Sequence, residues 1–226
     1  NSRLVLLREA RQTKESDAGT ALRPAADRLA VILKKLPEAA DLDELRGNEG
    51  DAAATYFAVF GHLIREQKDA FTFDGRNRRP PRDPVNSLLS FLYSLLRIEC
   101  EAAIEGVGMD PQIGFLHAIR PGRPSLALDL MEELRPLLAD RLVLTLINRK
   151  QLKEEDFVRR AGGGVMLTDE GRRTLLVAYQ KRKSEEVRHS AAEETVPYAL
   201  IPHMQARLLA RRLRGDLAHY PPFVGR

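Results

Sequence analysis

A turn rich in proline and glycine, near the middle of the chain, is the feature that most constrains its fold. Gly114-Phe-Leu-His117 runs into Arg120-Pro-Gly-Arg-Pro124, and a helical pattern begins at Ser125 with SLALDLMEELRP. Two prolines around a glycine favour a tight reversal between the flanking segments. At about 1.5 Å per residue, His117 and Asp129 each lie roughly 6 Å from this turn. If the segments fold back on each other, an imidazole meets a carboxylate, as in a metal site.

The helix after the turn carries an acidic strip. At about 100° per residue, its acids share a quarter to a third of the circumference: Asp129, Glu132, Glu133 and Asp140. Like charges three or four residues apart cost a few tenths of a kcal/mol per pair unless they are compensated. The pattern predicts no lysine or arginine on this face, which favours a bound cation. A solvated polar face remains the alternative.

A third acid lies upstream. Glu49 stands between Gly47 and Gly50, before an alanine-rich Tyr-Phe segment, where we expect a helix to start. Flanking glycines permit close backbone approach, although a helix dipole alone also favours an acid at this position. One imidazole nitrogen with carboxylates suits Mn²⁺ or Mg²⁺ better than a structural Zn²⁺ site, which uses several Cys or His ligands.

These motifs, taken together, resemble a known family. GNEG, DPVNSLLSFLYSLL, GMDPQIGFLH, PSLALDLMEELRPLLAD, AYQKRK and HMQARLLARRLRGD…YPPF follow one another in this order. Their combination resembles the C-terminal helical domain of the CRISPR-associated spacer-acquisition integrases, the Cas-one endonucleases. The likeness extends from about Leu4 to Phe223. The β-rich N-terminal domain that the family carries is absent here, so we expect a fragment or part of a longer chain.

The resemblance implies a site and a reaction. Glu49, His117 and Glu132 would be the ligands of one Mn²⁺ or Mg²⁺, and Asp129 an accessory catalytic acid. Some relatives have Asp at the last ligand position, where this chain has Glu132. The implied reaction joins short DNA fragments, the new spacers, into a CRISPR repeat array through attack of a 3′-hydroxyl on a phosphodiester. Attack by water would give cleavage instead. The implied partners are DNA, a second copy in a homodimer, and the small Cas-two protein.

Composition and pattern predict a mainly α fold. The chain has no Trp, only 6% aromatic residues, and many Leu, Ala and Arg, which is typical of helical proteins. We expect one catalytic domain over 1–226, with leading helices in 1–46, the metal-site core in 47–150, and a hairpin and basic helices in 151–226. Short apolar arms around Gly162-Gly-Gly164 predict one β-hairpin near 157–167.

The expected helices follow apolar periodicity. We expect helices over 1–14, 22–36, 49–67, 85–106, 168–188 and 198–215, and one long helix over 125–148 that is kinked near Pro136. A mobile loop is expected over 71–84, a short helical connection over 108–116, and a polar loop over 187–195. Asn86 is expected either to cap its helix or to orient a ligand.

The cysteine count and the hydropathy of the chain indicate in which compartment we expect it. A single Cys, Cys100, excludes a disulfide framework and fits a reducing cytoplasm. No apolar run reaches the length needed to span a membrane, so we expect no membrane association.

Basic residues gather in clusters, although the net charge is only +4. The clusters predicted to bind DNA phosphates comprise Arg76, Arg78 and Arg79 in the Pro-rich loop and Arg207, Arg211 and Arg214 near the C-terminus. Each cluster alone is more typical of a solvated surface.

Two other functions fit the same sequence. One is a helical DNA-binding or scaffold module without catalysis, whose acids are surface charge. The other is a related transposon integrase, for which the resemblance implies the same ligands. Dependence on a divalent ion separates the enzyme from the scaffold, because a scaffold loses DNA affinity with salt whatever metal is present.

Overall fold

The computed structural model describes residues 1–12 and 17–225, and they are mostly helical with two small antiparallel strand pairs. The expected mainly α fold is confirmed. The chain divides into two compact units, which we describe separately. Unit 1 comprises Asn1, Phe91–Leu142 and the chain from Leu176 onward, and unit 2 comprises Ser2–Ser90 and Val143–Leu175.

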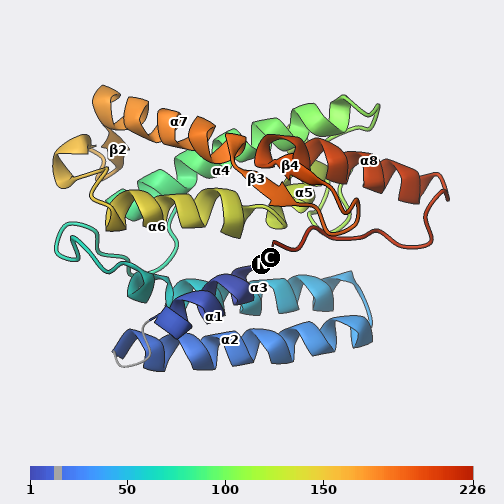
Figure 1. Ribbon diagram of the computed structural model, residues 1–226, viewed down its shortest axis with the longest axis horizontal. Coiled ribbons are helices and arrows are strands. Elements are labelled where there is room, and N and C mark those ends of the chain that lie inside the picture. The colour runs from blue at the N-terminus through green and yellow to red at the C-terminus, as the bar shows by residue number, and fades with distance from the viewer. Residues whose placement is uncertain (13–16, 226) are drawn as a thin grey trace. The chain divides into compact units, whose positions relative to one another are not determined.

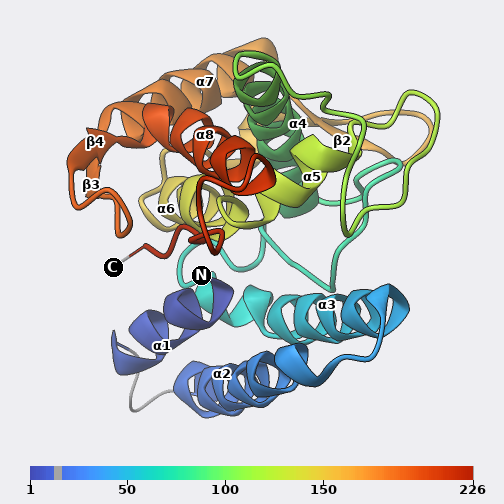
Figure 2. The ribbon, with the colours of Figure 1, turned by 90° about the vertical axis from the view of Figure 1, so that its right-hand side faces the viewer.

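Unit 2 begins with a group of helices, in which α2 packs against both α1 and α3 (Figures 1 and 2). Its first elements are α1 (Ser2–Gln12), α2 (Asp17–Lys35), η1 (Leu36–Glu38), α3 (Leu42–Ala58) and η2 (Phe60–Leu63). The expected end of the first helix at Lys14 lies outside the described residues.

Helix α3 starts earlier than the sequence predicted. Asp41 caps it, because its Oδ1 accepts hydrogen bonds from the backbone N–H groups of Asp43 (2.9 Å) and Glu44 (2.8 Å). The helix therefore begins at Leu42 and ends at Ala58, instead of running over 49–67. Glu49 consequently lies in the body of α3 and not at its start, so an effect of the helix dipole does not account for an acid at this position.

The segment between η2 and α4 (Pro84–Glu105) has no regular structure, and the amide of Asn86 organises it. The buried Oδ1 accepts from the side chain of Arg76 (2.6 Å) and the N–H of Asn77 (3.1 Å), while Nδ2 donates to the Gly75 carbonyl (2.9 Å) and to Asp83 Oδ2 (2.7 Å). Asn86 is not the cap of α4, because Asp83 is: its Oδ1 accepts from the N–H of Asn86 (2.7 Å).

The long helix expected over 125–148 is interrupted. It divides into α5 (Ser125–Glu132), a π-helix η3 (Arg135–Asp140) and α6 (Arg141–Asn148). The predicted break near Pro136 is confirmed, and its cause is that proline has no N–H to donate and crowds the carbonyl one turn earlier. In unit 1, α5 and η3 pack into one core with the second half of α4, through buried Leu96, Leu130, Leu134 and Leu138 among others.

Two strand pairs complete the fold. The predicted hairpin is confirmed as β1 (Phe157–Arg159) and β2 (Val165–Leu167), in unit 2. The helix α7 (Asp169–Ser184) follows, and Thr168 caps it by accepting from the N–H of Gly171 (3.0 Å). The polar loop expected over 187–195 is wrong in part, because β3 (Glu186–Arg188) pairs with β4 (Thr195–Pro197). Only Val187 in β3 is buried, so the sequence has no run of alternating apolar residues from which this strand pair could be predicted.

The described C-terminal segment is tied into unit 1 through Glu133. The final helix divides into η5 (Tyr198–Leu200) and α8 (Ile201–Leu213), which packs on α5. The carboxylate of Glu133 accepts from Tyr220 Oη, from Gln205 Nε2 (2.8 Å) and from the N–H of Phe223 (2.7 Å). Asn1 Nδ2 donates to the carbonyls of Glu133 (2.6 Å) and Phe223 (3.0 Å), and its Oδ1 accepts from the N–H of Gly225 (3.0 Å), so Asn1 lies beside the C-terminal segment.

Among the described residues, no helix is both long and apolar enough to cross a membrane.

Replacing Asn86 should loosen the segment that it organises. Asn86→Ala removes four hydrogen bonds, to Arg76, Asn77, Gly75 and Asp83. Because their polar groups would lose these bonds, we expect the free energy of unfolding to fall by about 3 kcal/mol. Chemical denaturation measures the change, and hydrogen exchange over 75–83 should accelerate. Arg78→Ala, at an exposed position in the same segment, is the matched control, and an equal effect in both variants would contradict the assignment.

Candidate metal centre

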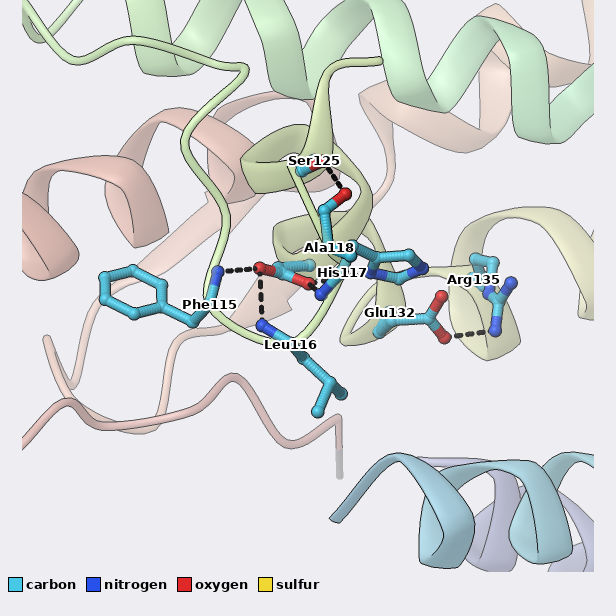
Figure 3. Close-up of polar contacts among 8 residues, drawn as sticks. Phe115, Leu116, His117, Ala118, Ser125, Glu132 and Arg135 are labelled. Atoms are coloured by element: carbon cyan, nitrogen blue, oxygen red, sulfur yellow. Dashed lines mark hydrogen bonds and ion pairs between the residues drawn. The ribbon is translucent and has the colours of Figure 1, made fainter. Parts of the chain in front are cut away.

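The loop that carries His117 is seated on the start of α5 by one carboxylate. Asp129 Oδ2 accepts from the N–H groups of Phe115 (2.6 Å) and Leu116 (3.1 Å), and its Oδ1 accepts from the N–H of His117 (2.9 Å). Ser125 Oγ donates to the carbonyl of Ala118 (2.9 Å) on the far side of His117. Figure 3 shows these bonds converging on the loop. The helical connection expected over 108–116 is wrong, because this segment is an irregular loop held by these bonds.

The same carboxylate determines how the imidazole is protonated. His117 Nδ1 lies 2.7 Å from Asp129 Oδ1. An ionised carboxylate only accepts hydrogen bonds, so Nδ1 must carry the proton, and in the neutral ring Nε2 keeps its lone pair. A carboxylate behind the histidine is the usual way in which proteins orient a metal-binding imidazole. The predicted meeting of His117 and Asp129 is thus confirmed, and it leaves the lone pair of Nε2 outside this hydrogen bond.

Hydrogen bonding keeps Asp129 ionised. Burial alone would raise the pKa of its carboxyl, but the bonds from the His117 ring and from the N–H groups of His117, Phe115 and Leu116 together lower that pKa below its ordinary value. Both oxygens of the Asp129 carboxylate therefore accept hydrogen bonds from this loop.

Gly114 is required for this close seating of the loop. A Cβ at this position would stand 2.7 Å from the backbone carbon and Cβ of Ser125 and 2.8 Å from Asp129 Oδ2. Such distances do not occur between real Cβ atoms and backbone, so any side chain would push the loop away from α5. The glycine before His117 is therefore a packing requirement of the site.

Glu132, one turn after Asp129, lies beside the imidazole. A carboxylate oxygen of Glu132 and a ring nitrogen of His117 lie within 4.8 Å of each other. Its Oε2 accepts from Arg135 Nη2, and Figure 3 shows the other oxygen directed toward the His117 side. The expectation that no arginine shares the acidic face is wrong, because Arg135 follows at i+3 and pairs with Glu132.

The remaining acids of the predicted strip point elsewhere. Glu133 binds the C-terminal segment, and burial raises the pKa of its carboxyl although the bonds from Tyr220, Phe223 and Gln205 oppose this. Asp140 is fully buried and accepts from Tyr93 Oη (2.6 Å). The strip is therefore not one solvated face: burial and the π-helix between Glu133 and Asp140 distribute its members among separate contacts.

Glu49 belongs to unit 2, in the body of α3, and its side chain is partly exposed. Neither Gly47 nor Gly50 has a positive φ, and a Cβ at either position would meet no atom within 4 Å. The glycines beside Glu49 thus adopt ordinary helical geometry and leave the surface around it open, instead of providing the unusual backbone that the sequence suggested.

The arginines predicted to bind DNA occupy different environments. Arg76 is partly buried and donates to Asn86, Ser90 and the carbonyl of Asn77, so it orders its own loop. Arg78 and Arg79 are exposed in that loop. Arg207 and Arg211 are exposed on α8, while Arg214 follows the helix and pairs with Asp216 (3.0 Å).

Comparison with known proteins places the chain in a family. The model of the family described as CRISPR associated protein Cas1 matches residues 1–181. A relative from Rhodospirillum rubrum, named CRISPR-associated endonuclease Cas1 2, is 57% identical over 99% of this chain and 66% of its own length. The solved structure of a casposase bound to integration product aligns with a TM-score of 0.77 and 29% identity, over 84% of this chain and 53% of that one. A solved Cas6-RT-Cas1–Cas2 complex aligns with a TM-score of 0.82 and 26% identity, over 99% of this chain and 23% of that one.

The chain belongs to the Cas1 family. The resemblance found in the sequence motifs is confirmed. The chain spans slightly less than two thirds, 66%, of the Rhodospirillum relative.

A methyl group at residue 114 should disturb the His117 loop. Gly114→Ala brings Cβ against Ser125 and Asp129, so we expect the free energy of unfolding to fall by about 1–3 kcal/mol. The ¹⁵N shifts of the His117 ring should also move away from those of an Nδ1–H tautomer. Gly47→Ala, with open space around its Cβ, should instead stabilise α3 by about 0.5–1 kcal/mol. Unchanged ring shifts in the Gly114 variant would contradict the packing argument.

The pH dependence of stability should reveal Asp129. Because its pKa is lower in the folded protein, its stabilising contribution is complete above the unfolded value of about 4 and is lost as the pH falls through the folded value. Asp129→Asn should therefore be less stable at pH 7, and the difference from the parent protein should shrink below about pH 4. Urea unfolding between neutral and acid pH measures this. A difference in stability between the two proteins that stays constant with pH would show that these hydrogen bonds do not lower the pKa of Asp129.

Proposed function

We propose that this chain carries the metal centre of a DNA strand transferase and endonuclease. The observation that supports the proposal most strongly is the pairing of His117 with Asp129, which leaves Nε2 available within reach of Glu132. The fixed loop, the assigned tautomer and the neighbouring carboxylate are the features expected of a preorganised cation site. Membership of the Cas1 family supports the same conclusion.

Glu49 is proposed as the third ligand, with His117 and Glu132. Its partly exposed carboxylate and the open surface on both sides of it would let another group approach. One nitrogen and two carboxylates form a donor set suited to Mn²⁺ or Mg²⁺. A bound ion of this kind would polarise a phosphoryl oxygen and stabilise the charge that develops on it.

Asp129 is proposed to act as a positioning residue. The expected accessory acid would take a proton from the nucleophile, but both oxygens of Asp129 already accept bonds from the loop. Its contribution is to hold His117 Nδ1–H and thereby aim Nε2. A lowered pKa also makes this carboxylate a poor proton acceptor near neutral pH.

The proposed substrate is DNA, and the proposed nucleophile is the 3′-hydroxyl of a short fragment that is joined into a repeat array. The similar casposase is bound to an integration product, which supports strand transfer. Water in place of the hydroxyl would give hydrolysis at the same centre. The proposed partners are a second copy of the chain and a Cas2 protein, since the similar Cas6-RT-Cas1–Cas2 assembly contains one.

Exposed arginines are proposed to hold the DNA backbone. Arg78, Arg79, Arg207 and Arg211 present guanidinium groups to solvent, which suits bidentate contacts to phosphates. Arg214 would join them by exchanging Asp216 for a phosphate. Arg76, also expected from the sequence, would contribute mainly by ordering the loop that carries Arg78 and Arg79.

Metal titration tests the centre. Calorimetry with Mn²⁺ should show one saturable site in the parent protein, and this binding should be lost in Glu49→Ala, His117→Ala and Glu132→Ala, because each removes a proposed ligand. Glu101→Gln, which removes an acid that pairs with Arg97 on α4, is the control. Equal weak binding by every variant would refute the site.

A DNA assay separates the enzyme from a binding module. A labelled fragment with a 3′-hydroxyl should be joined to a repeat-containing duplex with Mn²⁺ but not with EDTA, in the presence of the Cas2 partner. DNA binding that falls with salt but ignores the metal, without any product, would favour a non-catalytic scaffold.

A further inference from the structure

One loop of unit 1 displays large apolar side chains to solvent on both sides of His117 in the sequence. Ile113, Phe115 and Ile119 are 57%, 53% and 65% exposed. Among the described residues, Phe115 is the only phenylalanine or tyrosine that is exposed. Apolar residues scattered singly over a surface need no explanation, whereas a group of them marks a site of interaction. This loop therefore has the character of a binding surface.

Backbone hydrogen bonds hold this loop on α5. Asp129 accepts from the N–H groups of Phe115 (2.6 Å) and His117 (2.9 Å), and the N–H of Leu126 donates to the carbonyl of Pro111 (2.9 Å). Figure 3 shows the Phe115 ring projecting from the loop, away from the His117 ring. Because these bonds fix the backbone, the exposure of the apolar side chains does not come from a loose segment.

The charge of the same loop favours a nucleic acid as its partner. Arg120 is exposed and Arg123 is partly exposed, and both belong to the turn that follows His117. Proteins that bind single-stranded nucleic acid combine cationic groups, which contact the phosphates, with aromatic rings on which bases stack. Within a duplex the faces of a base are covered by the neighbouring base pairs, so Phe115 can stack only on an unpaired base.

The distance between Phe115 and His117 fits a strand that reaches the proposed metal centre. The two residues are separated by one position, so their Cα atoms lie at most about 7 Å apart. Successive nucleotides of one DNA strand rise about 3.4 Å each in a duplex. A strand whose reacting end lies at His117 therefore has a base within reach of Phe115 only a few nucleotides away.

We infer that this loop is a platform for unpaired DNA bases, and that Phe115 stacks on one base close to the reacting end of the strand. Ile113 and Ile119 contribute apolar surface from the same loop, and Arg120 and Arg123 hold neighbouring phosphates. This inference rests on the proposed function, because the ligand is the DNA on which the proposed metal centre acts. Every base has an aromatic face, so Phe115 fixes the position of the strand and does not read its sequence.

An abasic scan of the DNA tests the stacking. The probes are short duplexes with a single-stranded 3′ end, each lacking the base at one position of that end. Their Kd is measured by fluorescence anisotropy in EDTA, for the parent protein and for Phe115→Ala. For the parent protein we expect one abasic position to raise the Kd by about tenfold, the size of one lost base–aromatic stack. Phe115→Ala should bind the intact DNA about tenfold more weakly and lose nothing further at that position, because both changes remove the same contact.

Further variants separate the aromatic ring from apolar packing in general. Phe115→Tyr keeps the ring and should bind each probe as the parent protein does. Phe115→Leu keeps an apolar side chain without a ring, so it should behave as Phe115→Ala does, and it decides the outcome if Phe115→Ala does not fold. Val177→Ala removes an apolar side chain that is 63% exposed on α7, and it should leave every Kd as in the parent protein.

The outcomes distinguish this inference from the proposed function. Identical abasic profiles in the parent protein and a folded Phe115 variant, while the parent protein still joins DNA with Mn²⁺, overturn the inference alone. A Phe115→Ala protein that keeps its DNA affinity but no longer associates with a second copy or with Cas2 also overturns it, because the apolar group would then be a protein interface. Absence of saturable DNA binding by the parent protein overturns the inference together with the proposed function.

Discussion

The site depends on the hydrogen bonds that Asp129 accepts. Its two oxygens take the backbone N–H groups of Phe115, Leu116 and His117 and the ring nitrogen of His117. One side chain thus supplies the backbone partners of an irregular loop, orients an imidazole and selects its tautomer. A loop of this length without regular structure has few other ways to satisfy its polar groups. All the residues that make these bonds belong to unit 1.

Polar side chains that replace regular structure recur elsewhere. Asn86 holds the Pro-rich loop before α4, and Glu133 holds the C-terminal segment through Tyr220, Gln205 and Phe223. In each case a residue anchored on a helix collects backbone or side-chain donors from a segment that lacks its own ladder of hydrogen bonds. The helices supply the apolar core, and these anchors determine where the connecting segments lie.

The sequence predicted the helical fold because Leu and Ala recur with helical spacing, as in α4, where Leu88, Leu92 and Leu96 are fully buried. It also predicted the meeting of His117 with Asp129, since the Pro-Gly-Arg-Pro turn favours a tight reversal between the two segments. It failed for β3 and β4, where short polar strands carry no alternation, and for the start of α3, where the Asp41 cap was overlooked. The pairing of Arg135 with Glu132 was not predicted, although residues three apart on a helix are neighbours and can pair.

The π-helix has a consequence for how related chains should be compared. A π-turn accommodates about one more residue than an α-turn of the same span. Removing one residue between Arg135 and Asp140 would let an ordinary α-helix cover the same span, so the residues on either side would keep their faces. A single-residue gap at this position in a relative would therefore signal a change from π-helix to α-helix, with the buried neighbours on both sides retained.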